Sequence, residues 1–368
     1  MRKLILLIVL PVVAIGTYFL YLAHDAGEFR SVEDLHPGIC KKITGVPGAE
    51  DITLHPDWEV ALISSFDRRA AMDGNVRPGG IYAWALDGSM IEPVNLTPDA
   101  GTNFRPHGIS LFVGPDSRAT LFVVNHPGES LFGGPSESIG PAAANIPAHT
   151  VEVFDLEDMR LTHRETLAHA SMISPNDIVA VDHRRFYFTN DHGSAPGWMR
   201  TLEDYLRLGW ANVVYFDGAG YREAADGLSF ANGINLSPDG TRLYVAEATR
   251  GRIREYGRDT DTGRLNELRR IPVGFGVDNI ALDPETGELM LGGHLKLLTF
   301  TRHVDDADVL APSQAARVSP ANPPGIETVF LDDGQLISGA SVAASRDDVL
   351  LVGSVFEPHM VACRNDAG

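Results

Sequence analysis

The sequence predicts an all-β fold, a six-bladed β-propeller with a central channel, preceded by an apolar N-terminal helix. Three observations predict this fold. A two-part unit of short strands recurs six times, the strands are rich in Val, Ile, Tyr and Phe and are separated by Asp-Gly and Pro-Asp-Gly turns, and only one stretch, near Met199, has an amphipathic helical pattern. Propeller blades of about four strands each account for this pattern better than a helical solenoid does.

The first element is an uncharged, almost wholly apolar run from Leu4 to Ala23 that follows Arg2 and Lys3. A run of this length is enough to span a hydrocarbon core as a helix. Basic residues before an apolar run are typical of an export signal, so we expect residues 1–25 to be a signal-anchor or a cleaved signal peptide. The positive-inside rule then places the remaining chain outside the cytoplasm, either anchored to the membrane or secreted or periplasmic.

The six units follow, and each opens on a short strand that begins with small or polar residues. We expect them to form one domain over residues 38–365. After each opening the chain continues into apolar strands, among which LMLGGHLKLLTFTR from Leu289 is interpreted as strand, turn and strand, and DTDTGR from Asp259 as a hairpin turn. The openings are AEDITLHPD from Ala49, RPHGISLFV from Arg105, SPNDIVAVD from Ser174, FANGINLSPDG from Phe230, VDNIALDPETG from Val277 and ISGASVAAS from Ile337.

Composition narrows the possible functions and the compartment. The 368 residues include 30 Lys and Arg against 49 Asp and Glu, a formal net charge of −19. A surface this acidic repels phosphate backbones, so nucleic acid is not an expected partner. The two cysteines, Cys40 and Cys363, lie near the ends of the predicted domain. Outside the cytoplasm a disulfide between them is the expected state, and two unpaired buried thiols are the alternative.

Polar residues gather at the openings of the six units. In a propeller the innermost strands line the channel, so their first residues converge there. An Asn-Asp pair at one strand start is usually a turn, but recurrence at equivalent repeat positions favours a metal site. Carboxylates and amides without cysteine or clustered histidine suit calcium rather than zinc. The candidate residues are Glu50, Asp51, His107, Asn176, Asp177, Asn232, Asp278 and Asn279.

The strings AEDITLHPD, RPHGIS, VVNHP, NDIVAV, FANGINLSPDG and VDNIALDPETG, with cysteines near both ends, closely resemble the serum paraoxonase/arylesterase family from about Cys40 to Cys363. That family is a six-bladed propeller with two calcium ions in its channel, one catalytic and one structural. Its members hydrolyse lactones and aryl esters. The resemblance therefore implies a carboxylic-ester hydrolase with small-molecule substrates and two Ca²⁺ ions. The N-terminal segment also resembles the family's retained signal sequence, which implies membrane contact; no protein partner is implied.

The resemblance also implies roles for individual residues. His107 matches the histidine proposed as general base, and His126 matches its partner in a His dyad. Cys40 and Cys363 match the family disulfide. The ligands implied are Glu50, Asn176, Asn232, Asp278 and Asn279 for the catalytic calcium, and Asp51, Asp177 and the backbone carbonyl of Ile109 for the structural calcium.

The expected mechanism follows from these residue types. A divalent ion polarises the ester carbonyl, and His107 takes a proton from the attacking water. Neither a Gly-x-Ser-x-Gly elbow nor a His-Glu-x-x-His helix occurs in the sequence, which disfavours a serine hydrolase and a zinc protease. Two alternatives stay open: a non-catalytic propeller scaffold stiffened by calcium, and an enzyme similar to gluconolactonase or strictosidine synthase.

Two segments depart from the family pattern. The stretch GESLFGGPSESIGPAAANIPAHT after His126 is longer than the usual connection, and we expect it near the channel mouth. The loop SFDRRAAMDGNVRPGG lacks the tyrosine of the active-site flap in vertebrate members. The family's substrate preference is therefore not carried over to this chain.

Overall fold

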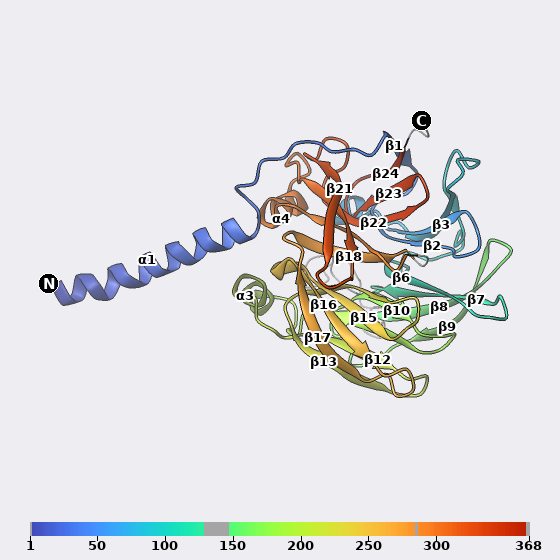
Figure 1. The fold of residues 1–368 in the computed structure, drawn as a ribbon, viewed down its shortest axis with the longest axis horizontal. Helices are drawn as coiled ribbons and strands as arrows, with labels where there is room; N and C mark the ends of the chain where they lie inside the picture. Colours follow the sequence, from blue (N-terminus) through green and yellow to red (C-terminus); the bar gives the residue numbers. More distant parts are fainter. Residues whose placement is uncertain (1, 129–146, 284–285, 366–368) are drawn as a thin grey trace.

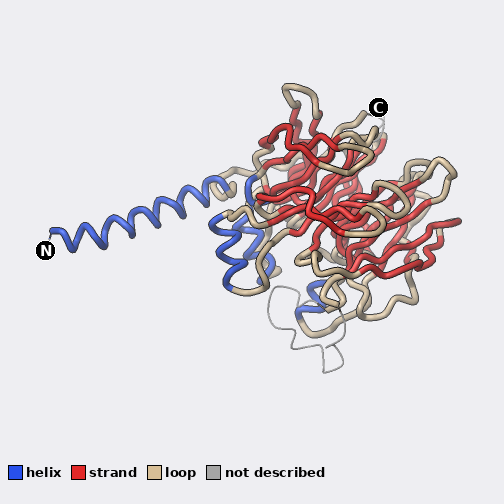
Figure 2. Tube along the Cα trace, turned by 90° about the horizontal axis from the view of Figure 1, so that it is seen from below, coloured by secondary structure: helices blue, strands red, loops and turns tan. Residues whose placement is uncertain are grey.

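The protein is a propeller of six four-stranded antiparallel sheets, as the sequence predicts (Figure 1). The structure is a computed structural model that describes residues 2–128, 147–283 and 286–365. Most of the insertion expected at the channel mouth, residues 129–146, lies outside the described residues. Figure 2 shows the strands as one body, with the helices gathered at one side of it.

The first three blades follow one another along the chain, and in each the strand order is sequential. Blade 1 contains β2 (Ala49–Leu54), β3 (Val60–Ser65), β4 (Gly80–Ala85) and β5 (Val94–Asn95). Blade 2 contains β6 (Pro106–Val113), β7 (Ala119–Asn125), β8 (Thr150–Glu157) and β9 (Arg160–Leu167). Blade 3 contains β10 (Pro175–Ala180), β11 (Phe186–Asn190), β12 (Ala211–Phe216) and β13 (Tyr221–Leu228).

The next two blades repeat this pattern, and the last takes one strand from the other end of the chain. Blade 4 contains β14 (Ala231–Leu236), β15 (Arg242–Glu247), β16 (Arg252–Arg258) and β17 (Leu265–Pro272). Blade 5 contains β18 (Gly276–Leu282), β19 (Leu289–His294), β20 (Ser313–Ser319) and β21 (Gly325–Asp332). Blade 6 contains β22 (Ala340–Arg346), β23 (Val349–Ser354), β24 (His359–Arg364) and β1 (Ile39–Thr44).

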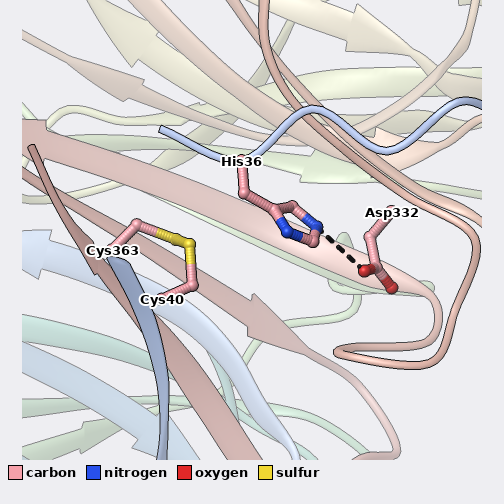
Figure 3. The surroundings of a disulfide bond; sticks show 4 residues. All are labelled: His36, Cys40, Asp332 and Cys363. Atoms are coloured by element: carbon pink, nitrogen blue, oxygen red, sulfur yellow. Dashed lines mark hydrogen bonds and ion pairs between the residues drawn. A yellow bond between two sulfur atoms is a disulfide. The ribbon is translucent and has the colours of Figure 1, made fainter. Parts of the chain in front are cut away.

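Blade 6 closes the ring because β1 pairs with β24 as its outermost strand. Cys40 lies directly opposite Cys363 in this pairing, and the two form the expected disulfide (Figure 3). The segment before β1 is held to blade 5 by a bridge between Leu35 and Leu331 and by a 3.0 Å contact between His36 Nε2 and Asp332 Oδ2. The segment from Leu35 through β1 therefore contacts both blade 5 and blade 6.

The remaining elements are the helices α1 (Arg2–Asp25), α2 (Arg68–Met72), α3 (Trp198–Leu206) and α4 (Leu297–Asp305) and a 3₁₀ turn, η2 (Ala248–Arg250). Helix α1 projects away from the propeller, and only its C-terminal end reaches the other helices (Figure 1). Among the described residues, no helix combines the length and apolar character that a membrane crossing requires.

One strand interpretation was wrong. The stretch LKLLTFTR does not continue the sheet after β19 but forms α4, and the third strand of blade 5 is β20. The hairpin turn predicted from Asp259 is confirmed, since β16 ends at Arg258 and β17 begins at Leu265.

The innermost strands β2, β6, β10, β14, β18 and β22 contact one another in sequence around the channel. Each of them carries a register shift, or β-bulge, near its first residues. A bulge re-aims side chains that would otherwise alternate between the two faces of the sheet. The shifts lie between Ala49 and Asp51, Pro106 and Ile109, Pro175 and Ile178, Ala231 and Ile234, Val277 and Ile280, and Ala340 and Val342.

Two glycines allow adjacent inner strands to approach at these bulges. A Cβ atom at Gly108 would lie 2.5 Å from Asp177 Oδ1, and one at Gly233 would lie 2.6 Å from the carbonyl oxygen of Asp278. Neither position has room for a side chain. The His-Gly and Asn-Gly pairs of the strand openings therefore combine a polar side chain with the close packing that brings these side chains together.

Candidate active site

The bulged openings of the inner strands and the helices around them line one cavity of about 570 Å³. This volume is in the range of small-molecule sites. The polar lining includes Glu50, His107, His126, Asn176, Asn232 and Asp278. The apolar lining includes Leu22 of α1, Leu297, Leu298 and Phe300 of α4, and Phe66, Phe230 and Phe356. The cavity thus joins a polar region to an apolar wall, and this wall was not predicted from the sequence.

Four side-chain oxygens at this polar region are buried and have no hydrogen-bond partner among the described residues. They belong to residues that are between 1% and 6% exposed and come from four different blades. Leaving a buried acceptor unsatisfied costs on the order of 1–3 kcal/mol, so four together call for a cation. The atoms are Glu50 Oε2, Asn176 Oδ1, Asn232 Oδ1 and Asn279 Oδ1.

Neighbouring contacts hold these ligand candidates in place. Asn279 Nδ2 donates to Glu50 Oε1 at 2.8 Å and to the Glu50 carbonyl at 3.1 Å, which leaves Asn279 Oδ1 free to face a cation. The Oδ2 atom of Asp278, which is also buried, lies 3.1 Å from His294 Nε2. Carboxylate and amide oxygens of this kind fit calcium, and all five residues expected for the catalytic ion are candidates by position.

The residues expected for the second ion lie on the neighbouring strands. The backbone N–H of Ile109 donates to Asp51 Oδ2, and that of Ile234 donates to Asp177 Oδ2, each at 2.7 Å. Each aspartate also accepts the N–H of its following residue through Oδ1. Every oxygen keeps a second lone pair for a cation, so these two carboxylates also fit calcium. For Ile109 the structure shows the N–H contact, and its carbonyl as a ligand stays a prediction.

The electrostatics of this region also favour a bound cation. Burial, together with the nearby charges of Asp51 and Asp278, raises the pKa of Glu50. Burial also raises the pKa of Asp51 to about 7, and burial with the charge on Asp51 raises the pKa of Asp177. Buried carboxylates this close together repel one another unless they are protonated or share a cation. A dication would offset this repulsion.

His107 lies beside these carboxylates and contacts an arginine that the sequence analysis did not single out. Its Nε2 is 3.5 Å from Glu50 Oε1, and its Nδ1 accepts a 2.7 Å hydrogen bond from Arg68 Nη2. Burial and the Arg68 guanidinium lower the pKa of His107 to about 3. The imidazole is therefore neutral in this environment.

His126 is adjacent to His107 as expected, but the two rings meet edge to face, with centroids 5.1 Å apart. Within the described part of the chain, no hydrogen bond joins them. His126 Nδ1 instead lies 2.8 Å from Nδ1 of His149, a third histidine in the row. Burial lowers the pKa of both, that of His149 to about 4. His149 was not predicted from the sequence, because it lies outside the six strand openings and no equivalent histidine recurs in the other units.

A second polar group also faces the cavity. Asp191 Oδ2 accepts from Asn176 Nδ2 at 3.3 Å, and its Oδ1 lies 2.7 Å from His192 Nδ1. His192 Nε2 lies 3.0 Å from Asp204 Oδ1 on α3. Burial alone would lower the pKa of His192, but these two carboxylates raise it to about 10. The pair of Asp191 and protonated His192 links the calcium-ligand candidate Asn176 to α3.

The C-terminal end of α1 completes the cavity wall. Leu22 and Ala26 are 5% and 4% exposed, and both line the cavity. Tyr18 Oη donates to the Tyr205 carbonyl of α3, and Arg207 forms an ion pair with Asp25. The segment predicted only as a signal or anchor therefore also contributes to the site.

Comparisons with known proteins place the chain among similar sequences. The sequence profile described as Arylesterase matches residues 141–363. Serum paraoxonase/arylesterase 2 of Rattus norvegicus is 32% identical over 357 residues, which cover 93% of this chain and 94% of the relative. The Homo sapiens protein of the same name is 32% identical and covers 93% of each chain. Serum paraoxonase/arylesterase 1 of Mus musculus is 33% identical over 346 residues, 89% of each chain.

Solved structures with a similar fold are more distant in sequence. A candidate gluconolactonase has a TM-score of 0.52 at 12% identity and covers 90% of this chain and 94% of its own. The calcium-binding protein regucalcin of Agrobacterium tumefaciens has a TM-score of 0.51 at 13% identity and covers 90% and 95%. At these identities the likeness establishes the propeller fold alone.

Proposed function

The chain belongs to the serum paraoxonase/arylesterase family, and from this premise we propose that it is a calcium-dependent hydrolase of aryl esters and lactones. The family membership supports an ester or lactone hydrolase with small-molecule substrates. The observation that supports the calcium dependence is the set of four buried oxygens without a hydrogen-bond partner among the described residues. Three belong to residues that line the cavity with His107, and the fourth belongs to Asn279, which contacts Glu50. The gluconolactonase alternative has weaker support, because only its fold is similar.

We propose that the catalytic calcium is held by Glu50, Asn176, Asn232, Asp278 and Asn279. When bound, calcium would polarise the ester carbonyl and stabilise the negative charge that develops on its oxygen. The chain's own residues supply the rest. The apolar wall that includes Leu297 and Phe300 would take up the aryl or alkyl part of the substrate and exclude water from it.

Asp51, Asp177 and the carbonyl of Ile109 are proposed to hold the second, structural calcium. Both aspartates are buried and bridge neighbouring inner strands through their backbone hydrogen bonds. Loss of an ion at this position would loosen the contact between β2, β6, β10 and β14, since a cation that binds only the folded state stabilises it. We therefore expect changes at Asp51 to affect mainly stability.

His107 and His126 are proposed as the histidines that act at the reacting carbonyl, with His107 next to Glu50 and His126 supporting it from the side. Whether His107 accepts a proton or donates a hydrogen bond depends on which ring nitrogen carries the proton. That nitrogen is determined by the contact with Arg68.

The test is to measure hydrolysis of phenyl acetate and a panel of lactones before and after calcium is removed with a chelator and then restored. We expect activity to fall with removal and to return with calcium. Asn232→Ala should abolish activity, whereas Asn235→Ala is a matched control on the same strand β14, because Asn235 Nδ2 binds the Ile280 carbonyl instead. Full activity after complete calcium removal would contradict the mechanism, and calcium binding without hydrolysis of any ester would favour the non-catalytic scaffold.

The protein is also proposed to be exported. The disulfide between Cys40 and Cys363 and the family relatives support an extracytoplasmic location. We propose that α1 remains attached as an N-terminal anchor, because its apolar residues Leu10, Val13 and Leu20 are more than half exposed while its C-terminal end packs on the propeller. Sequencing the N-terminus of the mature protein in a membrane fraction tests this, and a mature chain that begins after residue 25 would contradict it.

A further inference from the structure

Arg68 determines where the proton lies on His107. A guanidinium group has N–H donors and no acceptor, so the 2.7 Å contact from Arg68 Nη2 requires a lone pair on His107 Nδ1. The single proton of the neutral ring is then on Nε2. A second proton on Nδ1 would place two donors against each other, so the doubly protonated ring is incompatible with this contact.

The position of Arg68 is itself well determined. Arg68 is 5% exposed and begins the short helix α2, whose N-terminus is capped by Asp67 through a 2.9 Å hydrogen bond from the Ala70 N–H. The next residue, Arg69, donates to the carbonyls of His303 and Val304 in α4. Helix α2 is thereby capped at its N-terminus and held to α4 through Arg69, and its Arg68 guanidinium contacts His107.

The protonated nitrogen faces the calcium ligands. Nε2 of His107 is 3.5 Å from Glu50 Oε1, and both residues line the cavity. A nitrogen that already carries its proton cannot accept one from water, whereas it can donate a hydrogen bond to an oxygen that becomes negatively charged.

We propose that His107 acts on the substrate as a hydrogen-bond donor through Nε2–H rather than as a general base, and that Arg68 is the positioning residue that fixes this tautomer. His107 then stabilises the oxygen of the attacked carbonyl. The attacking water loses its proton to a carboxylate of the cavity, Glu50 or Asp278, and this proton is passed on to the departing alcohol or phenol. The kinetic part of this inference rests on the proposed ester hydrolysis, whereas the position of the proton does not.

The proton position can be measured directly. The full-length, calcium-loaded protein is labelled with [¹⁵N]histidine, and long-range ¹H–¹⁵N correlations are recorded near neutral pH, with His107 assigned as the signal missing from His107→Gln. We expect an unprotonated Nδ1 and a protonated Nε2. Arg68→Met should replace this single tautomer by a mixture, and Arg68→Lys should preserve it in part. Arg346→Met is the control that leaves it unchanged, because the Arg346 guanidinium donates to the Trp58 carbonyl and does not contact His107. A protonated Nδ1 in the natural protein, or an identical spectrum in Arg68→Met, would overturn the inference.

Kinetics then distinguish a donor from a base. Glutamine and asparagine carry the same amide group and neither is a base, but the glutamine N–H reaches roughly the place of Nε2 and the asparagine N–H that of Nδ1. We expect His107→Gln to retain at least about tenfold more kcat than His107→Asn, which should lose about a hundredfold, the usual effect of removing one oxyanion donor. Equal loss in both variants, with calcium binding and melting temperature intact, would overturn the donor role.

The two proposals fail in different ways. If the natural protein hydrolyses no ester or lactone, the proposed function fails, and the tautomer is still decided by the histidine spectrum. If the protein is an active esterase but His107 carries its proton on Nδ1, only the present inference fails.

Discussion

Two buried glutamates of this propeller show opposite electrostatics. Glu50 in the channel is 1% exposed, and Glu247 at the end of β15 is 0% exposed. Glu247 accepts hydrogen bonds from Arg252 and Arg254 and from the Ser229 N–H, and although burial alone would raise its pKa, these partners lower it. Among the described residues, the Glu50 carboxylate accepts one hydrogen bond, from Asn279, and burial with the charges of Asp51 and Asp278 raises its pKa.

The difference between the two glutamates is the source of positive charge. In blade 4 the chain supplies arginines that neutralise the buried carboxylate. In the channel the nearby carboxylates Asp51 and Asp278 raise the pKa of Glu50, and the Arg68 guanidinium, which hydrogen-bonds His107 rather than Glu50, opposes them by less. A buried charge is retained only when it is paired or coordinates a metal. Glu247 therefore has its positive partners within the chain, whereas Glu50 needs a cation from outside it.

The largest expected effect is that of Glu50→Gln on activity. Removing the charge should weaken calcium binding and lower kcat/KM by about a thousandfold, which corresponds to about 4 kcal/mol. In the ion-free protein the same change should raise the melting temperature at neutral pH, because an uncompensated buried carboxylate is removed. Calcium titration measures the loss of affinity, and thermal denaturation of the ion-free protein measures the change in melting temperature. A lower melting temperature of the ion-free variant would contradict this account of Glu50.

Glu247→Gln should have the opposite profile. It removes the partner of the buried Arg254 and should lower the free energy of unfolding by about 3 kcal/mol, while calcium affinity stays unchanged. The matched control is Glu267→Gln, since Glu267 also contacts Arg254, at 3.2 Å, but is 33% exposed and should contribute less than about 1 kcal/mol. Denaturant titration tests the pair, and equal destabilisation by both would refute the distinction.

Asp51→Asn should have a smaller effect, on stability. It weakens the proposed structural ion, so the stabilisation that calcium provides should fall by about 2–3 kcal/mol at a calcium concentration about 100 times the dissociation constant. The melting temperature with and without calcium reports it. Activity at saturating calcium should decline less in Asp51→Asn than in Glu50→Gln. A larger loss of activity in Asp51→Asn would contradict the assignment of Glu50 to the catalytic ion and Asp51 to the structural ion.

The smallest expected effect is the pH dependence of calcium stabilisation. Burial raises the pKa of Asp51 to about 7, above its unfolded value. In the ion-free protein this protonated group adds stability that is present below the unfolded pKa and is lost as pH rises through about 7. Calcium binds the ionised form, so its stabilising effect should grow over the same range, by up to about 1.4 kcal/mol per pH unit for each proton released. Melting temperatures on both sides of pH 7, with and without calcium, test this, and a constant difference would contradict it.

The sequence predicted the parts of the molecule that repeat. The six blades were predictable because the strand openings repeat. The ring of polar residues was predictable because four of the six openings place acidic or amide residues at the equivalent point, as at Asn176 and Asn232. Functional residues that have no equivalent in the other units could not be found from this repeat pattern. Arg68 in α2 and Asp191 after β11 line the cavity, and His149 before β8 contacts the cavity residue His126. The positions of these three residues depend on tertiary packing.

Helix α4 shows why local patterns failed. Residues 298–301 alternate apolar and polar side chains as a strand does, and the N-cap Lys296 makes no side-chain capping bond. The first N–H groups are instead satisfied from the distant N-terminal segment, as Leu297 N donates to the Ala26 carbonyl and Thr299 N to Glu28 Oε1. Capping from a segment so far away in the chain is invisible to a sequence pattern, so tertiary contacts decided the helix.

The pairing of β1 with β24 constrains the order in which the propeller is completed. Of the described strands, β1 is the earliest in the chain and β24 the latest, and the sequence separation between Cys40 and Cys363 is 323. During synthesis β1 stays unpaired until nearly the whole chain has been made. In blades 1 to 5, by contrast, each strand can pair with the strand that follows it in sequence. The pairing brings Cys40 and Cys363 opposite each other, so we expect the native disulfide to form at this last step, and it then joins the first strand covalently to the last.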